Sequence, residues 1–470
     1  MRVLVIGYGM AGARFAEEIR THDPDGVSVE LTMIGAEPHR AYNRVLLSTV
    51  LAGGLSTESV GLHDEYWAEK NQIDLRIDTE AVAIDRAAKF VELADGSRVD
   101  YDALVLATGS RAWIPPIDGL TGPDVSAFRT IDDCARIVAR ARPGAPVVVL
   151  GGGLLGLEAA RGLAGRGCAV TVAHPKARLM DRQLDLGAGA VLRQSMRRLG
   201  IEIKLGVQAV RHVPGCGVEL SDGSFLAAEL VVISAGVRAE DGLAGAAGLA
   251  VDNGILVDER MRTEDPDIYA IGDCAKPPGG AVGLVQPAWE QAAAVAARLT
   301  GADPDARYTG TPMVVRLKAR DVDLAALGDV HTTVDDEDAE VVLVHEPARG
   351  RYAKLVLRGD RVTGAIVLGV PDAAAAIIQL YDSGALAPSD RLALLLGRAL
   401  PGAPSTLSPG DLPASAVLCR CNTVRKGALV AAWRDGARDV AGLVSATRAS
   451  TGCGSCAAAL TDMADWLASA

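Results

Sequence analysis

The sequence has no apolar stretch long enough to cross a membrane, few aromatic residues, and fewer basic than acidic side chains. A membrane-spanning helix needs about 18 or more consecutive apolar residues, and no charge-free run of that length occurs in the 470 residues. Lys and Arg number 47 against 59 Asp and Glu, which gives a net charge of −12. Because nucleic-acid-binding domains are usually basic, this balance argues against nucleic acid as a partner. Only 4% of residues are aromatic, and an aliphatic-rich chain of this kind fits an α/β fold.

Cysteine is also scarce. Eight cysteines in this length are too few for a disulfide scaffold. The first residues, MRVLVIG, already read as a strand that runs into a glycine turn, so we expect no secretory signal and a cytoplasmic location. In a reducing compartment the cysteines are expected to be thiols or metal ligands. Four are isolated and are expected to be packing residues or ordinary surface thiols: Cys134, Cys168, Cys216 and Cys274.

Glycine, in contrast, is abundant and patterned. The chain begins RVLVIGYGMAGARFAEEI, a short β-branched strand followed by Gly7, Gly9 and Gly12 and then an amphipathic helix. The first glycine permits a tight turn, the second lets the backbone approach a pyrophosphate, and the third lets helix and strand pack closely. The phosphates would then lie at the positive end of the helix. Glu37 follows the next strand, where a carboxylate can bond a ribose hydroxyl, so this stretch predicts a dinucleotide site.

The same motif occurs a second time. The stretch APVVVLGGGLLGLEAARGLAGRGCAVTVAHP again gives strand, glycine turn, helix and strand, with the glycines at Gly151, Gly153 and Gly156. A ribose-binding acid is absent from the end of its second strand, where His174 stands, with Lys176 and Arg178 close behind. Basic groups there could accept a 2′-phosphate. The residues therefore leave NADH and NADPH both open, with a slight preference for NADH.

Two further segments complete a recognisable order. YDALVLATGS lies between the glycine motifs, and TEDPDIYAIGDCA follows the second one. With these segments, residues 1 to about 305 resemble the glutathione-reductase-like flavoproteins that bind two dinucleotides. The resemblance implies an α/β fold of two nested Rossmann-like domains. The FAD domain would comprise residues 1–110 and 242–307, and the inserted NAD(P)H domain residues 111–241.

The resemblance also implies individual contacts. Asp273 would bond the ribityl region of FAD, and Glu158 would lie near the nicotinamide, as the candidate catalytic residue. The segment PAWEQ, residues 287–291, would close over the isoalloxazine ring. The other implied FAD contacts are Arg44 and Ser48 in AYNRVLLS, Val82, Thr108, Gly109, Gly272 and Gln291, and the other implied NAD(P)H contact is Gly236.

The first domain departs from the disulfide reductases of this superfamily. Those enzymes carry a C-x-x-x-x-C pair on its helix, whereas residues 1–133 contain no cysteine. We therefore expect electrons to leave the flavin by a route other than a local dithiol.

The remaining chain divides into three parts. Residues 308–385 read as alternating strands followed by a helix, and resemble the third domain of the superfamily, which often supports dimer contacts, so a homodimer is an option. Residues 386–415 form a helical segment and a linker rich in Pro, Ser and Gly. Residues 416–470 hold the last four cysteines: Cys419, Cys421, Cys453 and Cys456.

Four thiolates in two close pairs can hold one metal centre. The spacing alone leaves zinc, a 2Fe-2S cluster and a redox dithiol open. A flavin that accepts a hydride gains two electrons, and a one-electron acceptor then needs a relay that zinc cannot supply. The segment LCRCNTVRKGALVAAWRDGARDVAGLVSATRASTGCGSC also resembles the bacterioferritin-associated-ferredoxin-like 2Fe-2S domain. Context and resemblance together favour a small helical 2Fe-2S domain.

As a whole, the chain resembles two groups of nitrogen-assimilation proteins. The segments LMDRQLD and GGGLLGLEAA are similar to the N-terminal half of the assimilatory nitrite reductase large subunit, and to the electron-transfer subunit of assimilatory nitrate reductase. The first group continues into a siroheme domain, for which these residues offer no cysteine set. We therefore expect NAD(P)H oxidation that feeds a separate, molybdenum-containing nitrate reductase subunit.

Other functions remain as alternatives. The protein could reduce a ferredoxin, a rubredoxin or an oxygenase system, or donate electrons to a separate nitrite reductase. A non-enzymatic alternative is an iron or redox sensor that uses the cluster as a switch.

Overall fold

The computed structural model describes the chain except for residues 281–282, 320, 398–408, 453, 455 and 470. Its first sheet is parallel, with the order β19-β7-β1-β2-β3. The central strand, RVLVI, is buried at every position but the first, as expected for a parallel strand covered on both faces. The strands are β1 (Arg2–Ile6), β2 (Glu30–Ile34), β3 (Ile73–Arg76), β7 (Ala103–Leu106) and β19 (Ile268–Ala270).

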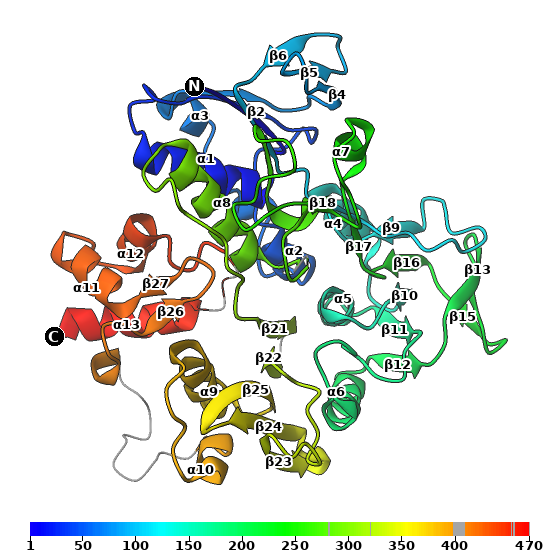
Figure 1. Ribbon diagram of the computed structural model, residues 1–470. Coiled ribbons are helices and arrows are strands. Elements are labelled where there is room, and N and C mark those ends of the chain that lie inside the picture. Colours follow the sequence, from blue (N-terminus) through cyan, green and yellow to red (C-terminus); the bar gives the residue numbers. More distant parts are fainter. Residues whose placement is uncertain (281–282, 320, 398–408, 453, 455, 470) are drawn as a thin grey trace.

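Two long helices, α1 (Met10–His22) and α8 (Val285–Leu299), contact each other beside this sheet. The last strand and the last helix of this unit thus come from residues that follow the whole second unit in the sequence (Figure 1). The smaller elements are α2 (Leu47–Leu51), α3 (Trp67–Lys70), α7 (Gly242–Ala246), an antiparallel sheet of β4 (Ala81–Asp85), β5 (Phe90–Leu93) and β6 (Arg98–Asp100), the pair β18 (Ile255–Leu256) and β20 (Ala275–Lys276), and single 3₁₀ turns at Arg44–Leu46, Glu58–Val60 and Gly272–Cys274.

The second sheet is also parallel, with the order β12-β11-β10-β16-β9. Its elements are contiguous in the sequence, unlike those of the first sheet. They are β9 (Val125–Ala127), α4 (Ile131–Arg140), β10 (Pro146–Leu150), α5 (Leu154–Gly165), β11 (Ala169–His174), α6 (Leu186–Arg198), β12 (Glu202–Leu205) and β16 (Leu230–Ile233), with a small antiparallel sheet of β13 (Ala209–Val213), β14 (Gly217–Leu220) and β15 (Phe225–Ala227).

A two-stranded antiparallel ribbon lies where the chain passes between the two units. It pairs β8 (Ser110–Ala112) with β17 (Val237–Ala239). The two crossings therefore lie side by side. The sequence-based expectation of two nested Rossmann-like folds is confirmed.

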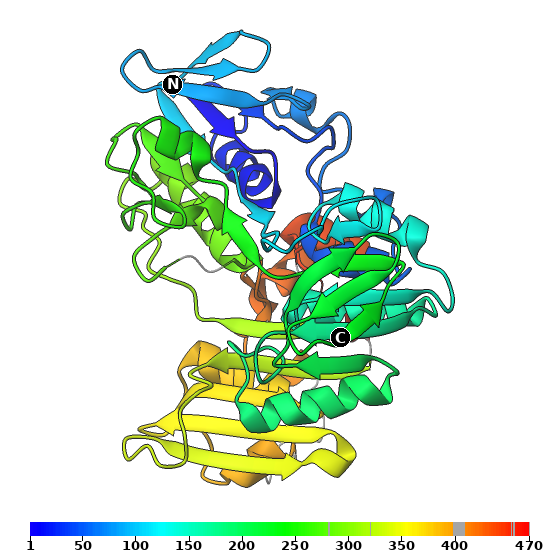
Figure 2. The ribbon, with the colours of Figure 1, turned by 90° about the vertical axis from the view of Figure 1, so that its right-hand side faces the viewer.

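The third sheet is antiparallel, with the order β21-β22-β25-β24-β23. Helix α9 packs on β25 and β22, and α6 of the second unit contacts β24 and β25 (Figure 2). The elements are β21 (Val314–Ala319), β22 (Val322–Gly328), β23 (Glu340–Glu346), a 3₁₀ turn (Pro347–Arg349), β24 (Arg351–Arg358), β25 (Arg361–Leu368), α9 (Pro371–Ser383) and α10 (Arg391–Leu395).

The C-terminal unit is small and mostly helical, and it lies between α1 and α8 on one side and α9 on the other (Figure 1). Its core includes Trp289, which belongs to α8 of the first unit. The unit is therefore packed on the first one. Its elements are a 3₁₀ turn (Pro409–Asp411), β26 (Val417–Cys419), β27 (Val424–Arg425), α11 (Lys426–Arg434), α12 (Val440–Thr447) and α13 (Ala457–Ser469).

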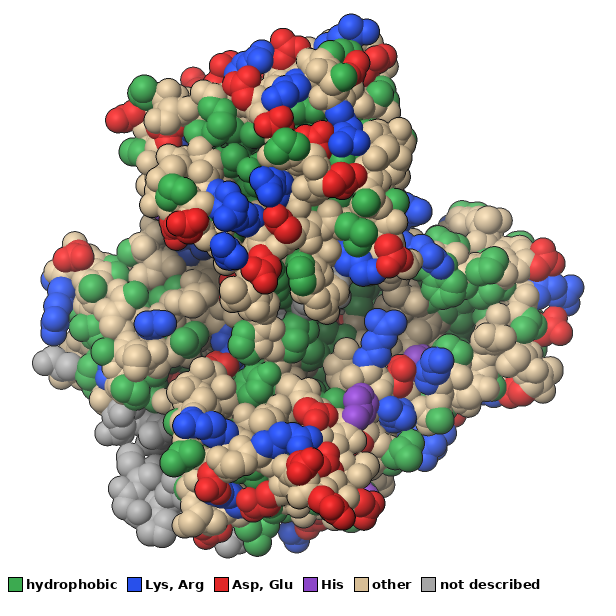
Figure 3. All heavy atoms as spheres, viewed as in Figure 1, with side chains coloured by type: hydrophobic (Ala, Val, Ile, Leu, Met, Phe, Trp, Pro, Cys, Tyr) green, Lys and Arg blue, Asp and Glu red, His purple; other side chains and the backbone are tan. Residues whose placement is uncertain are grey.

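Acidic and basic side chains are intermixed over the face of the molecule drawn in Figure 3. Among the residues described, no helix combines the length and the apolar character that a membrane crossing requires.

Candidate functional site

The first glycine turn is closed by backbone contacts that leave no room for side chains. Gly7 has φ +116°, and a Cβ there would lie 2.1 Å from the carbonyl oxygen of Ala107 on the neighbouring strand. A Cβ on Gly12 would lie 2.0 Å from the carbonyl oxygen of Gly7. Gly9, directly before α1, has no heavy atom within 4 Å of the same position. The turn therefore presents the open N-terminus of α1, which is the arrangement that accepts a phosphate.

This N-terminus opens into a cavity of about 610 Å³. That volume lies within the range of 300–1,000 Å³ that is usual for ligand and cofactor sites. Most of the residues predicted to contact FAD line the cavity: Gly7, Gly9, Glu37, Arg44, Val82, Thr108, Gly109, Gly272 and Asp273. The glycine cradle and the cavity together fit FAD.

Three of the residues predicted to contact FAD, Gly12, Gln291 and Ser48, are not among the residues that line the cavity. Gly12 packs beneath the turn, and the Gln291 side chain accepts a hydrogen bond from the backbone N–H of Gly272 at 2.8 Å. Ser48 is buried, and its hydroxyl has no hydrogen-bond partner among the described residues.

Charged side chains of the cavity are already paired with each other. Asp273 accepts hydrogen bonds from Arg129 and from the Ser110 hydroxyl, both at 2.8 Å. Glu37 is ion-paired with Arg44 and accepts a hydrogen bond from a tyrosine hydroxyl.

Sequence reasoning missed Arg129 and Ser110. Ser110 ends the YDALVLATGS segment, for which the resemblance implied only Thr108 and Gly109 as contacts. Arg129 follows β9, where no local motif marks it.

The second glycine turn repeats the geometry of the first. Gly151 has φ +124°, and a Cβ there would lie 2.1 Å from the carbonyl oxygen of Ser234. A Cβ on Gly156 would lie 2.1 Å from the carbonyl oxygen of Gly151, while Gly153, at the start of α5, has open space. Both nucleotide folds therefore expose a helix N-terminus at the same point of the motif.

The other residues predicted to contact NAD(P)H differ in their burial and in the hydrogen bonds that they already make. His174 ends β11, and its Nδ1 accepts a hydrogen bond from the backbone N–H of Gly152 at 3.1 Å, while burial lowers the pKa of the ring. The Arg178 guanidinium donates to two backbone carbonyls, at 2.8 and 2.9 Å. Glu158 is buried within α5, and Gly236 lies next to the ribbon with φ +117°. Their contacts with a nicotinamide cofactor stay predictions.

Three of the four C-terminal cysteines, from two segments of the chain, lie close together. The sulfur atoms of Cys419 and Cys421 are 3.6 Å apart, and Cys456, also buried, stands directly before α13. The backbone N–H of Ser450 and the side-chain amide of Asn422 point at the Cys419 sulfur, at 3.5 and 3.7 Å. Hydrogen-bond donors of this kind stabilise a negatively charged thiolate more than a neutral thiol.

The electrostatic environment of these cysteines also favours the thiolate, which is the form that binds metals. Hydrogen bonds from Cys421 and then Cys456 lower the pKa of the Cys419 thiol far below its usual value, although burial acts in the opposite direction. Cys453, the fourth predicted ligand, lies outside the described residues. Within the described part of the chain, no group of three His, Cys, Asp or Glu side chains is placed to hold a metal ion without Cys453. Each iron of a 2Fe-2S cluster takes two cysteines, so the donor set fits such a cluster.

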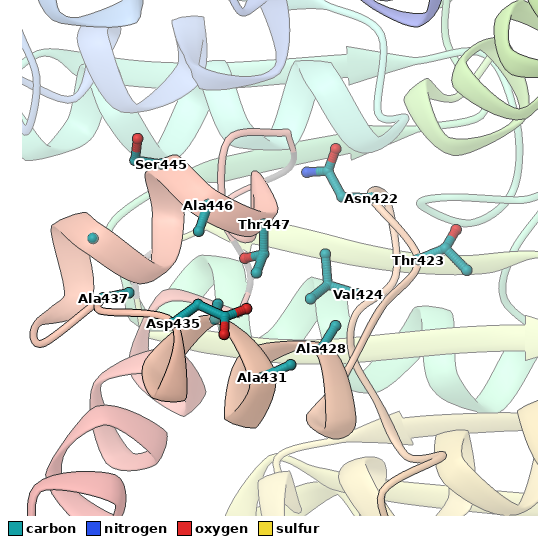
Figure 4. Close-up of a pocket in the computed structure, with 12 residues that line it drawn as sticks. Asn422, Thr423, Val424, Ala428, Ala431, Asp435, Ala437, Ser445, Ala446 and Thr447 are labelled. Atoms are coloured by element: carbon teal, nitrogen blue, oxygen red, sulfur yellow. The ribbon is translucent and has the colours of Figure 1, made fainter. Parts of the chain in front are cut away.

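A groove of about 700 Å³ opens beside these cysteines (Figure 4). It lies between the loop that carries Asn422 and Thr423, the helix α11 and the helix α12. Asn422 therefore borders both the groove and the thiols.

The isolated cysteines have the surroundings that the sequence predicted. Cys134, Cys168 and Cys274 are buried free thiols, and Cys216 is exposed. Burial raises the pKa of Cys134 to about 11.

Comparison with protein families finds three matches along the chain. Residues 1–292 match the family described as pyridine nucleotide-disulphide oxidoreductase. Residues 314–384 match the rubredoxin NAD+ reductase C-terminal domain, and residues 417–465 match the BFD-like [2Fe-2S] binding domain. These matches confirm the resemblance that the sequence motifs indicated.

Curated relatives extend the match to nearly the whole chain. A nitrite reductase [NAD(P)H] of Bacillus subtilis is 35% identical over 97% of this chain and 56% of its own length. An assimilatory nitrate reductase electron transfer subunit of the same organism is 33% identical over 98% of this chain and 59% of its own length. The chain therefore spans little more than half of these relatives.

Solved structures share the fold of the first three units. The covalent putidaredoxin reductase–putidaredoxin complex gives a TM-score of 0.73 at 28% identity, over 84% of this chain and 95% of that one. A ferredoxin reductase from Rhodopseudomonas palustris gives 0.73 at 30% identity, over 82% and 96%.

Proposed function

Because the chain belongs to the pyridine nucleotide-disulphide oxidoreductases, with FAD- and NAD(P)H-binding folds and a 2Fe-2S-binding domain, we propose that it is the electron-transfer partner of an assimilatory nitrate reductase. In this role it oxidises NAD(P)H and delivers electrons to a separate, molybdenum-containing catalytic subunit. The overall reaction is NAD(P)H + 2 oxidised one-electron acceptors → NAD(P)⁺ + H⁺ + 2 reduced acceptors.

The shared packing of the cysteines and the flavin cavity wall carries this proposal. Met10 and Val285 line the cavity and also pack against the hydrophobic core that contains Cys419 and Cys421. Two side chains that line the space that fits FAD thus belong to the same packed cluster as the cysteines. An electron exit placed at this wall replaces the dithiol that residues 1–133 lack.

The residues of the chain provide binding and orientation. Bound FAD supplies two-electron chemistry, and a bound 2Fe-2S cluster supplies single-electron transfer. The open helix N-terminus after Gly9 would hold the FAD pyrophosphate, and the one after Gly153 that of NAD(P)H. Cys419, Cys421 and Cys456, together with Cys453, would hold the cluster, and the amide donors of Ser450 and Asn422 would stabilise its thiolates.

A reconstituted assay tests the acceptor. The purified protein is mixed with the purified catalytic subunit of an assimilatory nitrate reductase, NADH and nitrate, and nitrite formation is measured. We expect nitrite only when both proteins are present. Absence of nitrite from a preparation that holds full FAD and iron would refute the proposal, and parallel runs with NADPH establish which nicotinamide is used.

A reductase for a ferredoxin or rubredoxin is the second candidate. It is favoured by the match of residues 314–384 to the rubredoxin reductase C-terminal domain. Adding ferredoxin or rubredoxin in place of the nitrate reductase subunit decides between the two. Faster acceptor reduction there, with no nitrite from the first assay, would support this second function. A separate nitrite reductase as acceptor, homodimer formation and a cytoplasmic location stay predictions.

A further inference from the structure

Trp289 belongs to the flavin-binding unit but packs in the core of the cysteine unit. It is the fifth residue of α8, is 5% exposed, and shares a hydrophobic core with Cys419, Cys421 and Cys456. Its indole N–H donates to the backbone carbonyl of Met10 at 3.1 Å. The residue before it, Ala288, lines the flavin cavity. The Trp289 ring therefore stands between the cavity wall and the cysteines.

The far edge of this ring faces Gly452, which belongs to a loop of residues 448–452 beside the cysteines. A Cβ on Gly452 would lie 2.6 Å from the Cys421 sulfur and 2.8 Å from two ring carbons of Trp289. A side chain at position 452 would therefore collide with both the Cys421 sulfur and the Trp289 ring. The sulfur and the ring thus face the same point of the backbone, which has room for glycine alone.

Polar contacts hold the same loop in place. The buried Asn43 side chain donates to the carbonyls of Thr451 and Gly452, at 2.7 and 2.5 Å. Arg448, with φ +58°, donates to Glu17 on α1 at 2.9 Å. Each of these hydrogen bonds joins a residue of the first unit to a residue of the loop, so the first unit holds the loop in a defined position.

We propose that Trp289 is a positioning residue. It fixes the loop of residues 448–452, and with it the neighbouring Cys421, against the flavin cavity and thereby sets the rate of electron transfer between the two cofactors. This proposal rests on the proposed function. When bound, FAD and the cluster would supply this transfer one electron at a time, and two such transfers would return the flavin to its oxidised form with release of one proton to solvent. No bond to Trp289 forms or breaks. The ring acts through the placement of the loop.

The test compares Trp289→Leu with two other variants. Trp289→Phe keeps an aromatic ring in the core but lacks the ring carbons that face Gly452, and Trp433→Leu removes an indole that packs against the same core beneath Arg438. Each holoprotein is mixed with NADH without oxygen, and the bleaching rates of flavin and cluster are recorded in the same stopped-flow trace. Iron, FAD and the visible circular dichroism of the cluster are measured on the same samples.

Electron transfer slows as the path between two cofactors lengthens. We therefore expect the ratio of the cluster reduction rate to the flavin reduction rate to fall severalfold in Trp289→Leu. Its iron and FAD contents should match the wild type and its cluster dichroism should change. Trp289→Phe should give a ratio between those of Trp289→Leu and the wild type, because its shorter ring does not reach Gly452. Trp433→Leu should retain the wild-type ratio.

Three results would overturn the proposal. An unchanged ratio in Trp289→Leu refutes positioning, and loss of iron in that variant shows that the ring holds the loop together instead. If the wild-type protein carries both cofactors but NADH never reduces the cluster, the proposed function itself fails. The wild-type trace thus separates the two failures.

Discussion

Replacement of Gly12 by alanine tests the close packing of the first glycine turn. The new Cβ would lie 2.0 Å from the carbonyl oxygen of Gly7, whereas real Cβ contacts are essentially never shorter than 3.0 Å. The backbone must therefore move by about 1 Å, and overpacking of this kind typically costs about 1–3 kcal/mol. We expect Gly12→Ala to lower the unfolding free energy of the apoprotein by about 2 kcal/mol.

The same displacement should weaken FAD binding, because the turn that holds the pyrophosphate opens. A loss of about 2 kcal/mol corresponds to about 30-fold in the dissociation constant. Urea unfolding of the apoprotein measures the first effect, and titration with FAD followed by flavin fluorescence measures the second.

Gly9→Ala is the matched control, because no heavy atom lies within 4 Å of its Cβ position. It should change apoprotein stability by less than about 1 kcal/mol and still weaken FAD binding, since the methyl group points into open space at the cofactor site. If Gly12→Ala unfolds at the same urea concentration as the wild type, the reasoning from the close contact is refuted.

Three further predictions follow from single side chains. Burial would raise the pKa of Asp185, but hydrogen bonds from Ala188 and Lys354 hold it below its usual value. Its stabilisation is therefore present above the usual carboxyl pKa and lost as pH falls, so in urea titrations Asp185→Asn should cost about 1–3 kcal/mol at neutral pH and progressively less below about pH 4. A cost that persists to about pH 2 would contradict this. In the native protein a thiol reagent should label exposed Cys216 well before Cys134, whose pKa is raised by burial to about 11, and peptide mass spectrometry would show the reverse order if the packing were wrong. Cys421→Ser should lower bound iron from about two atoms per chain to near zero while FAD stays bound, and full iron in this variant would exclude Cys421 as a ligand.

The sequence predicted the glycine turns because the contact between Gly7 and Gly12 lies within one turn of the chain, so spacing alone encodes it. The close approach of Gly7 to Ala107, far along the sequence, is not encoded in this way. The Asp273–Arg129 pair could not be predicted in this way, since its members are 144 residues apart and belong to different segments of the fold. Only the folded chain brings them together.

The residues of the PAWEQ segment face two different parts of the molecule, which the motif alone does not indicate. Successive residues of a helix point in directions about 100° apart. Ala288 thus lines the cavity while Trp289 packs with the cysteines. The contact with Gly452 depends on a loop more than 160 residues further along, and no local pattern announces it.

The discontinuous first sheet has a consequence for the order in which the protein forms during synthesis. The second sheet is complete once β16 (Leu230–Ile233) has been made, but the first lacks its edge strand until β19 (Ile268–Ala270) emerges. At about 5–20 residues per second, the N-terminal strands wait on the order of ten seconds or more for their last neighbour. The inserted nucleotide fold is thus able to close first and to hold the two halves of the outer one together through the β8–β17 ribbon.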